Sequence, residues 1–320
     1  MPDFGPLPDE GSRARSDGFI GRRRRAWAEL PGNVRGGLWL LVAAGFFTAM
    51  VTLIKIAGAR LHVTEILLFR QIFMMLLALP VILRDIPGAL RTARLDLQLL
   101  RIAAAVTAMT LGFTAFIHLP LADAVTIGFA RGFFILIFAI LLLGESVGWR
   151  RWAAIAVGFC GVFLVMQPGE GGFDVYSLMA LCGAAGAGLV MVIIRKLSQT
   201  DRPVTILAFQ AFGVGVLVIP PALWFWRTPT LEELLLLAAI GVVSALSQLS
   251  NIFAYRAGEA SAIAPLDYAR LIYAVILGLV VFGDWPGGHV FLGAAVIVAA
   301  GLYTFYRERR LGRMTSGAPG

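Results

Sequence analysis

Charged side chains are scarce in this chain, where they make up 14% of the residues, against about 25% in an ordinary soluble domain. Hydrophobic residues make up 59%. This balance leaves no room for a soluble catalytic domain. The apolar residues also gather in stretches of roughly 17 to 24 residues, each long enough to cross a hydrocarbon core of about 30 Å. The composition therefore indicates a membrane protein.

Cysteine and histidine are nearly absent as well, with 2 and 3 residues. Cys160 and Cys182 both fall inside apolar stretches, where buried thiols usually serve packing, so we expect no disulfide. No group of histidine, cysteine and carboxylate residues has the spacing of metal ligands. The sequence indicates neither a metal site nor a cofactor.

Ten apolar stretches are predicted to cross the membrane as helices. They cover residues 37–58, 65–83, 100–118, 121–143, 150–167, 175–195, 203–226, 233–255, 261–282 and 288–306. The predicted fold class is an all-α polytopic membrane protein with ten transmembrane helices.

The second five stretches repeat the first five, and single residues show the repeat. Residues 122–131 read ADAVTIGFAR and residues 260–270 read ASAIAPLDYAR, while Gly144-Glu145 is matched by Gly283-Asp284. Because each half has an odd number of spans, the two halves enter the membrane in opposite orientations. That arrangement, two inverted five-helix repeats, is the plan of many secondary transporters.

The repeat also predicts how the chain is divided. We expect five-helix units at residues 36–168 and 174–307, followed by a cytoplasmic tail at residues 308–320. Residues 1–35 are rich in Pro, Gly, Asp and Arg, so they are predicted to form a disordered basic cytoplasmic tail.

The net charge of +8 could suggest a nucleic-acid partner, but its distribution indicates membrane topology instead. At the ends of the spans and in the loops between them, nearly every basic residue, Arg101 included, falls on segments of one side. The other side has only Arg60 and Arg227. By the positive-inside rule both termini are cytoplasmic. We therefore expect a multi-pass protein of the bacterial inner membrane whose partners are the lipid bilayer and a small molecule, with no nucleic acid.

Three arginines inside the spans are the strongest local signal: Arg70, Arg131 and Arg270. Each would cost about 2.5–3.5 kcal/mol at a helix centre facing lipid, so they should face the protein interior or water. Asp267 lies three residues before Arg270 and predicts an ion pair, which is either structural or part of a binding site. Arg131 has no partner on its own span. It requires backbone carbonyls, a carboxylate from another helix, or an anionic group of a substrate.

Two polar stripes run along the third and eighth spans at repeat-related positions. The third span has Thr107, Thr110, Thr114 and His118, and the eighth has Ser244, Ser247, Gln248, Asn251 and Tyr255. Each stripe lies on one helix face. We expect the stripes to face one another across a central wet cavity. The alternative is that the hydroxyls bond their own backbone or join neighbouring helices.

These features together resemble the EamA family of the drug/metabolite transporter superfamily, over nearly the whole chain between the tails. The strongest matches are residues 122–145 and 260–284, with Phe69-Arg70. Residues 260–271 resemble the branch of S-adenosylmethionine-type and riboflavin-type uptake carriers. Two departures stand out, because Gln210 replaces an arginine at the repeat-related position of Arg70 and Asp284 stands where glutamate is commoner.

The resemblance implies a secondary transporter that moves a small polar or zwitterionic organic metabolite by alternating access. It further implies a cavity lined by the third, fourth, eighth and ninth spans. A proton or ion could be coupled to transport, and the protein could be a monomer or a homodimer. The candidate substrate-binding residues are Arg131, Arg270, Asp267, Gln248, Asn251, Thr114, Tyr255, His118 and Arg70.

Several rival functions use the same residues differently. An exporter of the same fold is the nearest. A membrane-bound acyltransferase could use His118 and Asp123, whose spacing is that of a general-base pair, although Pro120 interrupts it. Residues 144–148 read GESVG and match a serine-hydrolase pattern around Ser146, but at a helix end. A passive channel is a further alternative. We expect no enzyme.

Reporter fusions test the predicted topology. A fusion at Gly258 should report the cytoplasm and one at Gly287 the outside, because the ninth span separates them and the basic residues lie on the Gly258 side. Alkaline phosphatase and green fluorescent protein give opposite readings at each site. A periplasmic signal from Gly258 would contradict the model.

Overall fold

The computed structural model describes residues 30–86, 91–144, 149–167 and 174–316, so residues 1–29 of the predicted tail lie outside it. Within these ranges every regular element is a helix. The helices of the first half are α3 (Gly32–Ala57), α4 (Val63–Ile82), η1 (Leu83–Asp85), α6 (Leu95–His118), α7 (Leu121–Gly128), α8 (Arg131–Leu143) and α9 (Trp149–Met166).

The second half contains more short segments. Its helices are α10 (Val175–Leu197), α11 (Pro203–Ala208), η2 (Phe209–Gly213), α12 (Val214–Trp224), α13 (Leu231–Ala257), α14 (Ala260–Ile263), η3 (Ala264–Tyr268), α15 (Ala269–Leu277), η4 (Gly278–Phe282) and α16 (Gly288–Ser316). Of these, η2 and η4 are π-helical and η3 is a 3₁₀ helix. α16 continues as a helix to Ser316, beyond the apolar part Gly288–Thr304 that matches the predicted tenth span.

Within the described residues, 8 helical segments are long and apolar enough to cross a membrane, and Trp152–Met166 and Gly288–Thr304 are shorter apolar helices. Together they account for the ten predicted spans. Large apolar side chains stay exposed on the outside of the bundle, including Val280 at 75% and Leu223 at 62%. Such a surface is unfavourable in water and suits contact with lipid.

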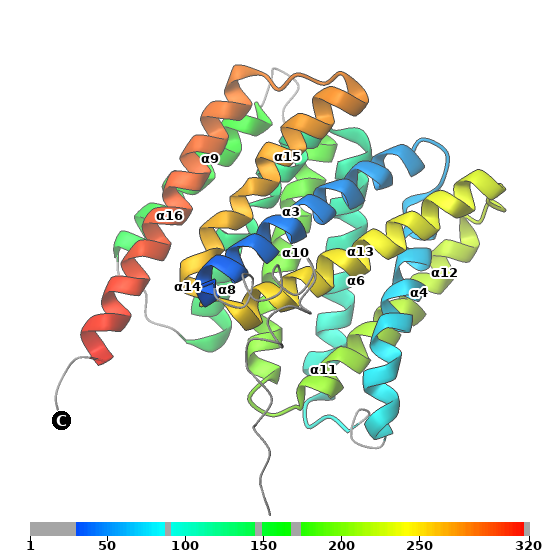
Figure 1. The fold of residues 1–320 in the computed structure, drawn as a ribbon, viewed down its shortest axis with the longest axis horizontal. Coiled ribbons are helices and arrows are strands. Elements are labelled where there is room, and N and C mark those ends of the chain that lie inside the picture. Colours follow the sequence, from blue (N-terminus) through cyan, green and yellow to red (C-terminus); the bar gives the residue numbers. More distant parts are fainter. Residues whose placement is uncertain (1–29, 87–90, 145–148, 168–173, 317–320) are drawn as a thin grey trace, which may run out of the picture.

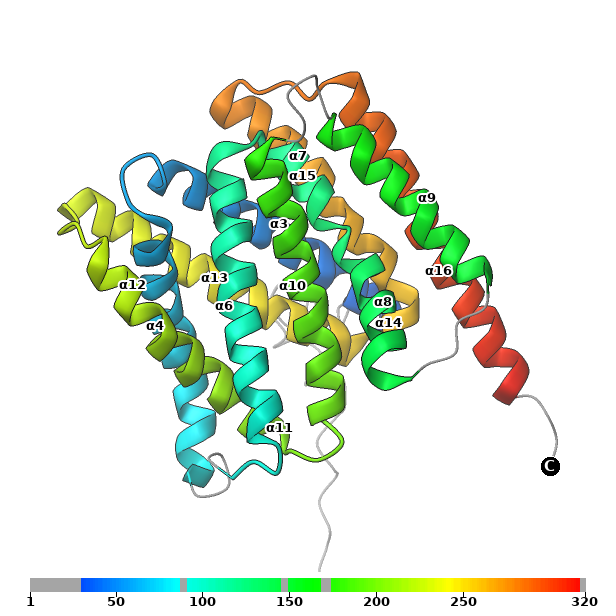
Figure 2. The ribbon, with the colours of Figure 1, turned by 180° about the vertical axis from the view of Figure 1, so that it is seen from behind.

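The packing of the helices is symmetric between the two halves. α3 packs mainly against α13, and its counterpart α10 packs mainly against α6, the counterpart of α13. Two other pairs join counterparts directly. α9 packs on α16 at one side of the molecule, and α4 packs on α12 at the other (Figure 1). The same arrangement is visible from behind (Figure 2). Each half therefore completes its core with helices of the other half.

Two buried carboxylates hold the α4–α12 side together, one at each end. Glu65, fully buried near the start of α4, accepts a hydrogen bond from the backbone N–H of Arg227, just after α12 (2.6 Å). Asp201, just before α11, accepts one from the backbone N–H of Ala93, just before α6 (3.0 Å). The two contacts are related by the repeat. Glu65 joins the start of the second span to the loop after the seventh span, and Asp201 joins the start of the seventh span to the loop after the second span.

Asp201 is held as a carboxylate by its surroundings. Burial raises the pKa of this group, but hydrogen bonds from Thr92, the Ala93 N–H and Gln98 more than offset that effect, so its pKa lies below the usual range. The charge therefore stays in place at neutral pH and fixes the loop between α10 and α11.

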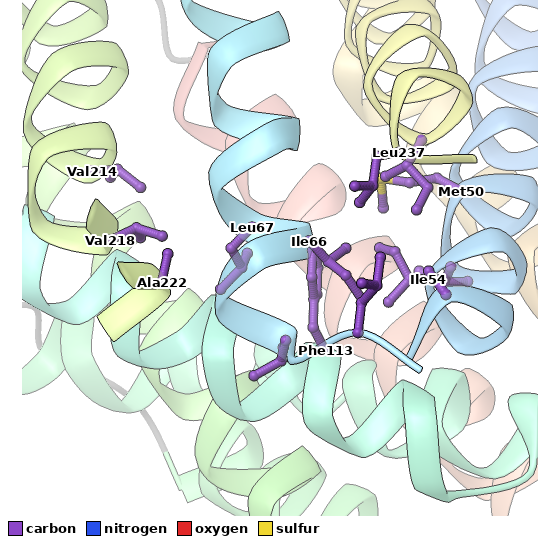
Figure 3. Close-up of a cluster of buried hydrophobic side chains, with 14 of the residues drawn as sticks. Met50, Ile54, Ile66, Leu67, Phe113, Val214, Val218, Ala222 and Leu237 are labelled. Carbon is purple, nitrogen blue, oxygen red and sulfur yellow. The ribbon is translucent and has the colours of Figure 1, made fainter. Parts of the chain in front are cut away.

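The largest apolar core lies between α3, α4, α6, α12 and α13 (Figure 3). Ile54 of α3, Ile66 of α4 and Leu237 of α13 are fully buried there. Val214, Val218 and Ala222 extend the same core onto one stripe of α12 at helical spacing. The core thus joins elements of both halves.

Glycines set the close approach of α9 and α16. A Cβ added to Gly161 would lie 2.8 Å from the carbonyl oxygen of Gly293, and one added to Gly293 would lie 2.6 Å from that of Gly161. Both distances are too short for a carbon atom against backbone. These glycines therefore serve packing, since a side chain at either position forces the two helices apart.

The substitution Gly161→Val tests this contact. We expect it to lower stability by about 1–3 kcal/mol, the usual cost of overpacking, and to lower the thermal unfolding midpoint in detergent. Gly288→Val is the matched control on α16, because a Cβ there meets nothing within 4 Å. Equal effects of the two substitutions would show that the α9–α16 crossing does not depend on glycine.

Candidate functional site

The fourth and ninth spans both change helical pitch just before their arginine. Between α7 and α8 the backbone bonds at i→i+3 spacing, as in Ala130 N–H to Ile127 O (2.9 Å). In the ninth span the 3₁₀ segment η3 contains Pro265, which cannot donate a backbone hydrogen bond. Asp267 lies near the end of η3 and Arg270 in the first turn of α15, three residues apart, so their side chains come together on one face.

Asp267 faces two arginines from different halves. One of its oxygens lies 2.8 Å from the guanidinium of Arg270, and the other lies 3.7 Å from that of Arg131. The expected Asp267–Arg270 pair is therefore present. Arg131 does have a carboxylate neighbour, which comes from another helix. Two guanidinium groups share one carboxylate, so the cluster keeps a net positive charge.

The two arginines differ in their surroundings. The Arg270 side chain is 11% exposed and lies over the ring of Phe47, 4.3 Å from its centroid. The Arg131 side chain is 36% exposed. The closer, stacked pair of Arg270 is characteristic of a fixed structural contact. The contact of Arg131 with Asp267 is longer, and its side chain is more exposed.

Arg131 lines three adjoining cavities. One of about 290 Å³ also touches Asp267 and lies between α8, η3 and α16. A second of about 190 Å³ is enclosed by α3, α6, α7, α8, α10 and α15 and includes Arg270. The third, of about 510 Å³, extends along α4, α6 and α10 toward α11. The charge cluster therefore sits at a junction of open spaces inside the helix bundle, between elements of both halves.

The cavity of about 510 Å³ contains two further predicted site residues, Arg70 and Gln248. It also contains residues that sequence reasoning missed. Arg101 had been counted as a cytoplasmic loop residue, but α6 begins at Leu95 and places Arg101 within the helix, 1% exposed. Gln71 and Gln210 complete the polar lining. Since Gln210 is the repeat counterpart of Arg70, the repeat alignment could have pointed to it.

The stripe on α6 does not face the cavities, which corrects the prediction for the third span. The cavity-lining residues of α6 include Arg101, Ala108 and Phe113, and Thr107 and Thr114 lie on the opposite face at 100° per residue. Thr114 donates to the carbonyl of Thr110 (2.8 Å), and the ring of His118 stacks on Tyr176 of α10 at 3.9 Å. The polar groups of Thr114 and His118 thus have partners on their own helix or on a neighbouring one, which agrees with the alternative that these residues bond the backbone or join helices.

The stripe on α13 is divided between packing and the site. Ser247 donates to the carbonyl of Ala43 on α3 (3.1 Å), and Asn251 donates to its own helix at Ser247 (3.0 Å). Tyr255 is 49% exposed and interacts electrostatically with Asp267, Arg270 and Arg131. On α13, then, Gln248 lines a cavity and Tyr255 belongs to the surroundings of the charge cluster.

A separate ion pair closes the end of the bundle near the α3–α4 loop. Lys55 lies 3.2 Å from the carboxylate of Asp284 and donates to the carbonyl of Leu119 (2.7 Å). Its ammonium also lies over the ring of Phe282. The sequence alone assigns Lys55 no role, because a lysine at a helix end usually extends into the headgroup region. In the fold it links α3 to two loops.

The catalytic alternatives find no support in this geometry. His118 is stacked on Tyr176, whereas Asp123 lies in the electrostatic environment of His289, Asp284 and Lys55. The two residues are thus engaged by different neighbours. Ser146 of the GESVG run lies outside the described residues.

Comparison with known families decides the assignment. The model of the EamA-like transporter family matches residues 34–167 and again residues 175–306. The chain belongs to the EamA-like transporter family. Each of the two matches spans five of the predicted transmembrane stretches. The repeat-exchanged packing of α3 with α13 and of α10 with α6 is thus a feature of an EamA-like transporter.

Relatives of this EamA-like transporter carry several different substrates. An S-adenosylmethionine uptake transporter of Rickettsia bellii is 29% identical over 85% of this chain and 94% of its own. A riboflavin transporter of Vibrio cholerae is 30% identical over 83% of this chain and 91% of its own. A pseudopaline exporter of Pseudomonas aeruginosa is also 30% identical, over 83% of this chain and 95% of its own.

One solved structure superposes with a TM-score of 0.57 at 18% identity, over 86% of this chain and 98% of that one. A likeness at this identity shows the fold alone. The relatives include both uptake and export, so the family establishes small-metabolite transport and leaves its direction open.

Cysteine accessibility tests the placement of the cavity. In a Cys160→Ala, Cys182→Ala background, Gln248→Cys should react with a charged, membrane-impermeant thiol reagent, because Gln248 lines the cavity of about 510 Å³. Thr107→Cys should stay unreactive, because Thr107 is exposed on the opposite face of α6, where lipid excludes water. Labelling is measured by mass shift. If Thr107→Cys were modified and Gln248→Cys were not, α6 would present its threonine stripe to the cavity, as the sequence had predicted, and this placement of the cavity would be wrong.

Proposed function

We propose that the protein is a secondary transporter that moves a small polar or zwitterionic organic metabolite across the bacterial inner membrane by alternating access. The observation that carries this proposal is the half-paired Arg131 at the junction of three cavities. Its surroundings come from both halves, as Asp267 of η3 and the walls of α6 and α10 show. A site between inverted repeats is exposed to opposite sides when the halves rock.

In this mechanism Arg131 binds an anionic group of the substrate. A carboxylate or phosphate accepts two hydrogen bonds from one guanidinium and binds it more strongly than the 3.7 Å contact with Asp267 does. Asp267 then remains with Arg270, which it already meets at 2.8 Å. Gln248 and Tyr255 would supply polar contacts to the remainder of the molecule.

The ion pair of Lys55 and Asp284 indicates that the bundle is closed at the end near the α3–α4 loop. The cavity of about 510 Å³ extends instead toward the α10–α11 end, past Ile194 and Pro203. With both termini cytoplasmic, as the charge distribution predicts, that end faces the cytoplasm. We therefore propose an inward-facing arrangement, with residues 36–168 and 174–307 as the two units that move.

Transport by purified protein in proteoliposomes tests the function. Radiolabelled riboflavin and S-adenosylmethionine, with a panel of carboxylated and phosphorylated metabolites, are offered to vesicles preloaded with the same unlabelled compound. Saturable counterflow of at least one compound is expected. Counterflow of none, with correctly folded protein, would contradict the proposal, and non-saturable flux would indicate a channel.

Variants assign the role of Arg131. For a compound that is transported, Arg131→Gln should raise KM about tenfold or more, because a charge-assisted hydrogen bond is lost. Arg131→Lys should recover only part of the affinity, because lysine lacks the bidentate geometry. Arg94→Gln is the matched control, since Arg94 is exposed at the start of α6 and pairs with Asp96. Unchanged transport by both Arg131 variants would exclude it from binding.

A further inference from the structure

We infer that the substrate is a net organic anion with two anionic groups, and that Arg70 and Arg101 form a second anion-binding site for it, distinct from the Arg131–Asp267–Arg270 cluster. This inference rests on the proposed function and names the substrate class. It is supported by two guanidinium groups, each with a buried Nε that lacks a hydrogen-bond partner, that no described carboxylate balances.

Arg101 is the clearer of the two. Its side chain is 1% exposed and lines the cavity of about 510 Å³. One of its terminal nitrogens donates to the carbonyl of Ile206 on α11 (2.9 Å), whereas its buried Nε has no hydrogen-bond partner among the described residues. An arginine stays charged at any physiological pH, and a single carbonyl contact satisfies only one of its five N–H groups.

Arg70 lies on another wall of the same cavity, and its buried Nε also lacks a hydrogen-bond partner within the described part of the chain. Its guanidinium carbon lies 5.7 Å from the ring centroid of Phe113, a contact that stabilises a cation without neutralising it. Leaving two such groups unpaired inside a membrane protein is costly, so an anion that fills the space between them would stabilise the fold.

The neighbouring glutamines add hydrogen-bonding capacity rather than charge. Gln71 donates its amide to the carbonyls of Gln210 (3.4 Å) and Ala211 (2.9 Å) in the π-helical segment η2. The side-chain oxygen of Gln210 is buried without a partner in the described structure. That oxygen can accept a hydrogen bond from a hydroxyl or amino group of a bound molecule alongside Arg70.

The charge balance of the connected cavities sets the substrate class. Among the described residues that line the three cavities, the cations are Arg70, Arg101, Arg131 and Arg270, and the anion is Asp267. A molecule with a net positive charge would add to this imbalance. A molecule with carboxylate or phosphate groups at two positions reduces it, with one group on Arg131 and the second on Arg70 and Arg101. Complementary charge thus favours an organic anion over a cation.

Anion binding to the purified full-length protein tests this inference. The protein is placed in nanodiscs of phosphatidylcholine, which lack anionic lipid, and titrated with citrate or pyrophosphate at constant ionic strength. We expect a saturable rise of the thermal unfolding midpoint. In Arg101→Gln the half-saturating concentration should increase about tenfold or more, and Arg101→Lys should be intermediate. Arg94→Gln, with its exposed charge removed from the same helix, should bind as the unchanged protein does.

The outcomes separate a binding role from a structural one. If Arg101→Gln lowers the midpoint without ligand but leaves the half-saturating concentration unchanged, Arg101 only stabilises the fold and the inference is overturned. Absence of stabilisation by both anions overturns it too. Stabilisation that requires phosphatidylglycerol and is lost in Arg101→Gln would assign the arginines to a lipid headgroup, and would also overturn it.

Transport distinguishes this inference from the function on which it rests. Saturable counterflow of a neutral or cationic compound, without inhibition by citrate or pyrophosphate, would overturn the anionic substrate class and leave the transporter intact. Anion binding that is weakened in Arg101→Gln, in a protein that exchanges no compound, would support the second site and contradict the transport function.

Discussion

The carboxylate of Asp267 is the contact on which the centre of this protein depends. It is the one described acidic group on the walls of the cavities around the charge cluster, and it faces guanidinium groups from both halves of the chain. In a region shielded from water, charges interact strongly and unpaired ones are costly. Asp267 therefore joins the fourth span to the ninth, while the excess of positive charge leaves a demand that an anionic molecule can meet.

The two halves are similar in sequence pattern but unequal at the centre. The segments η2, η3 and η4 all belong to the second half, where backbone carbonyls are displaced from regular α-helical pairing. Gln71 of the first half takes up two of these carbonyls in η2. Irregular backbone of this kind is tolerated inside a membrane only where protein or water satisfies it. The second half thus has the π-helical segments, and α4 and α6 of the first half contribute Arg70 and Arg101 to the same cavity.

How much of the fold and site could be predicted depended on how far apart in the sequence the interacting residues lie. The spans and the pair of Asp267 with Arg270 follow from residues close together in the sequence, and the repeat follows from comparing the two halves. The contact of Asp267 with Arg131 could be anticipated only as one of three possibilities, because the partner lies on a distant helix. The α6 stripe misled, since hydroxyls such as that of Thr114 find carbonyls on their own helix and need no cavity. Arg101 was missed because a basic residue near a predicted span end is indistinguishable from a topology signal.

The exchanged packing of the helices has a consequence for biosynthesis. α3 is made first, but its main neighbour α13 is the eighth span to leave the ribosome, and the counterpart pair, α6 with α10, is also divided between the halves. During synthesis the first five helices must therefore wait in the bilayer with their inner faces incomplete. A nascent chain halted after residue 168 would carry a membrane domain without a finished interior, and would be a natural target for membrane-embedded quality control. Assembly of this protein is thus a late event, set by arrival of the eighth helix rather than by insertion of the first.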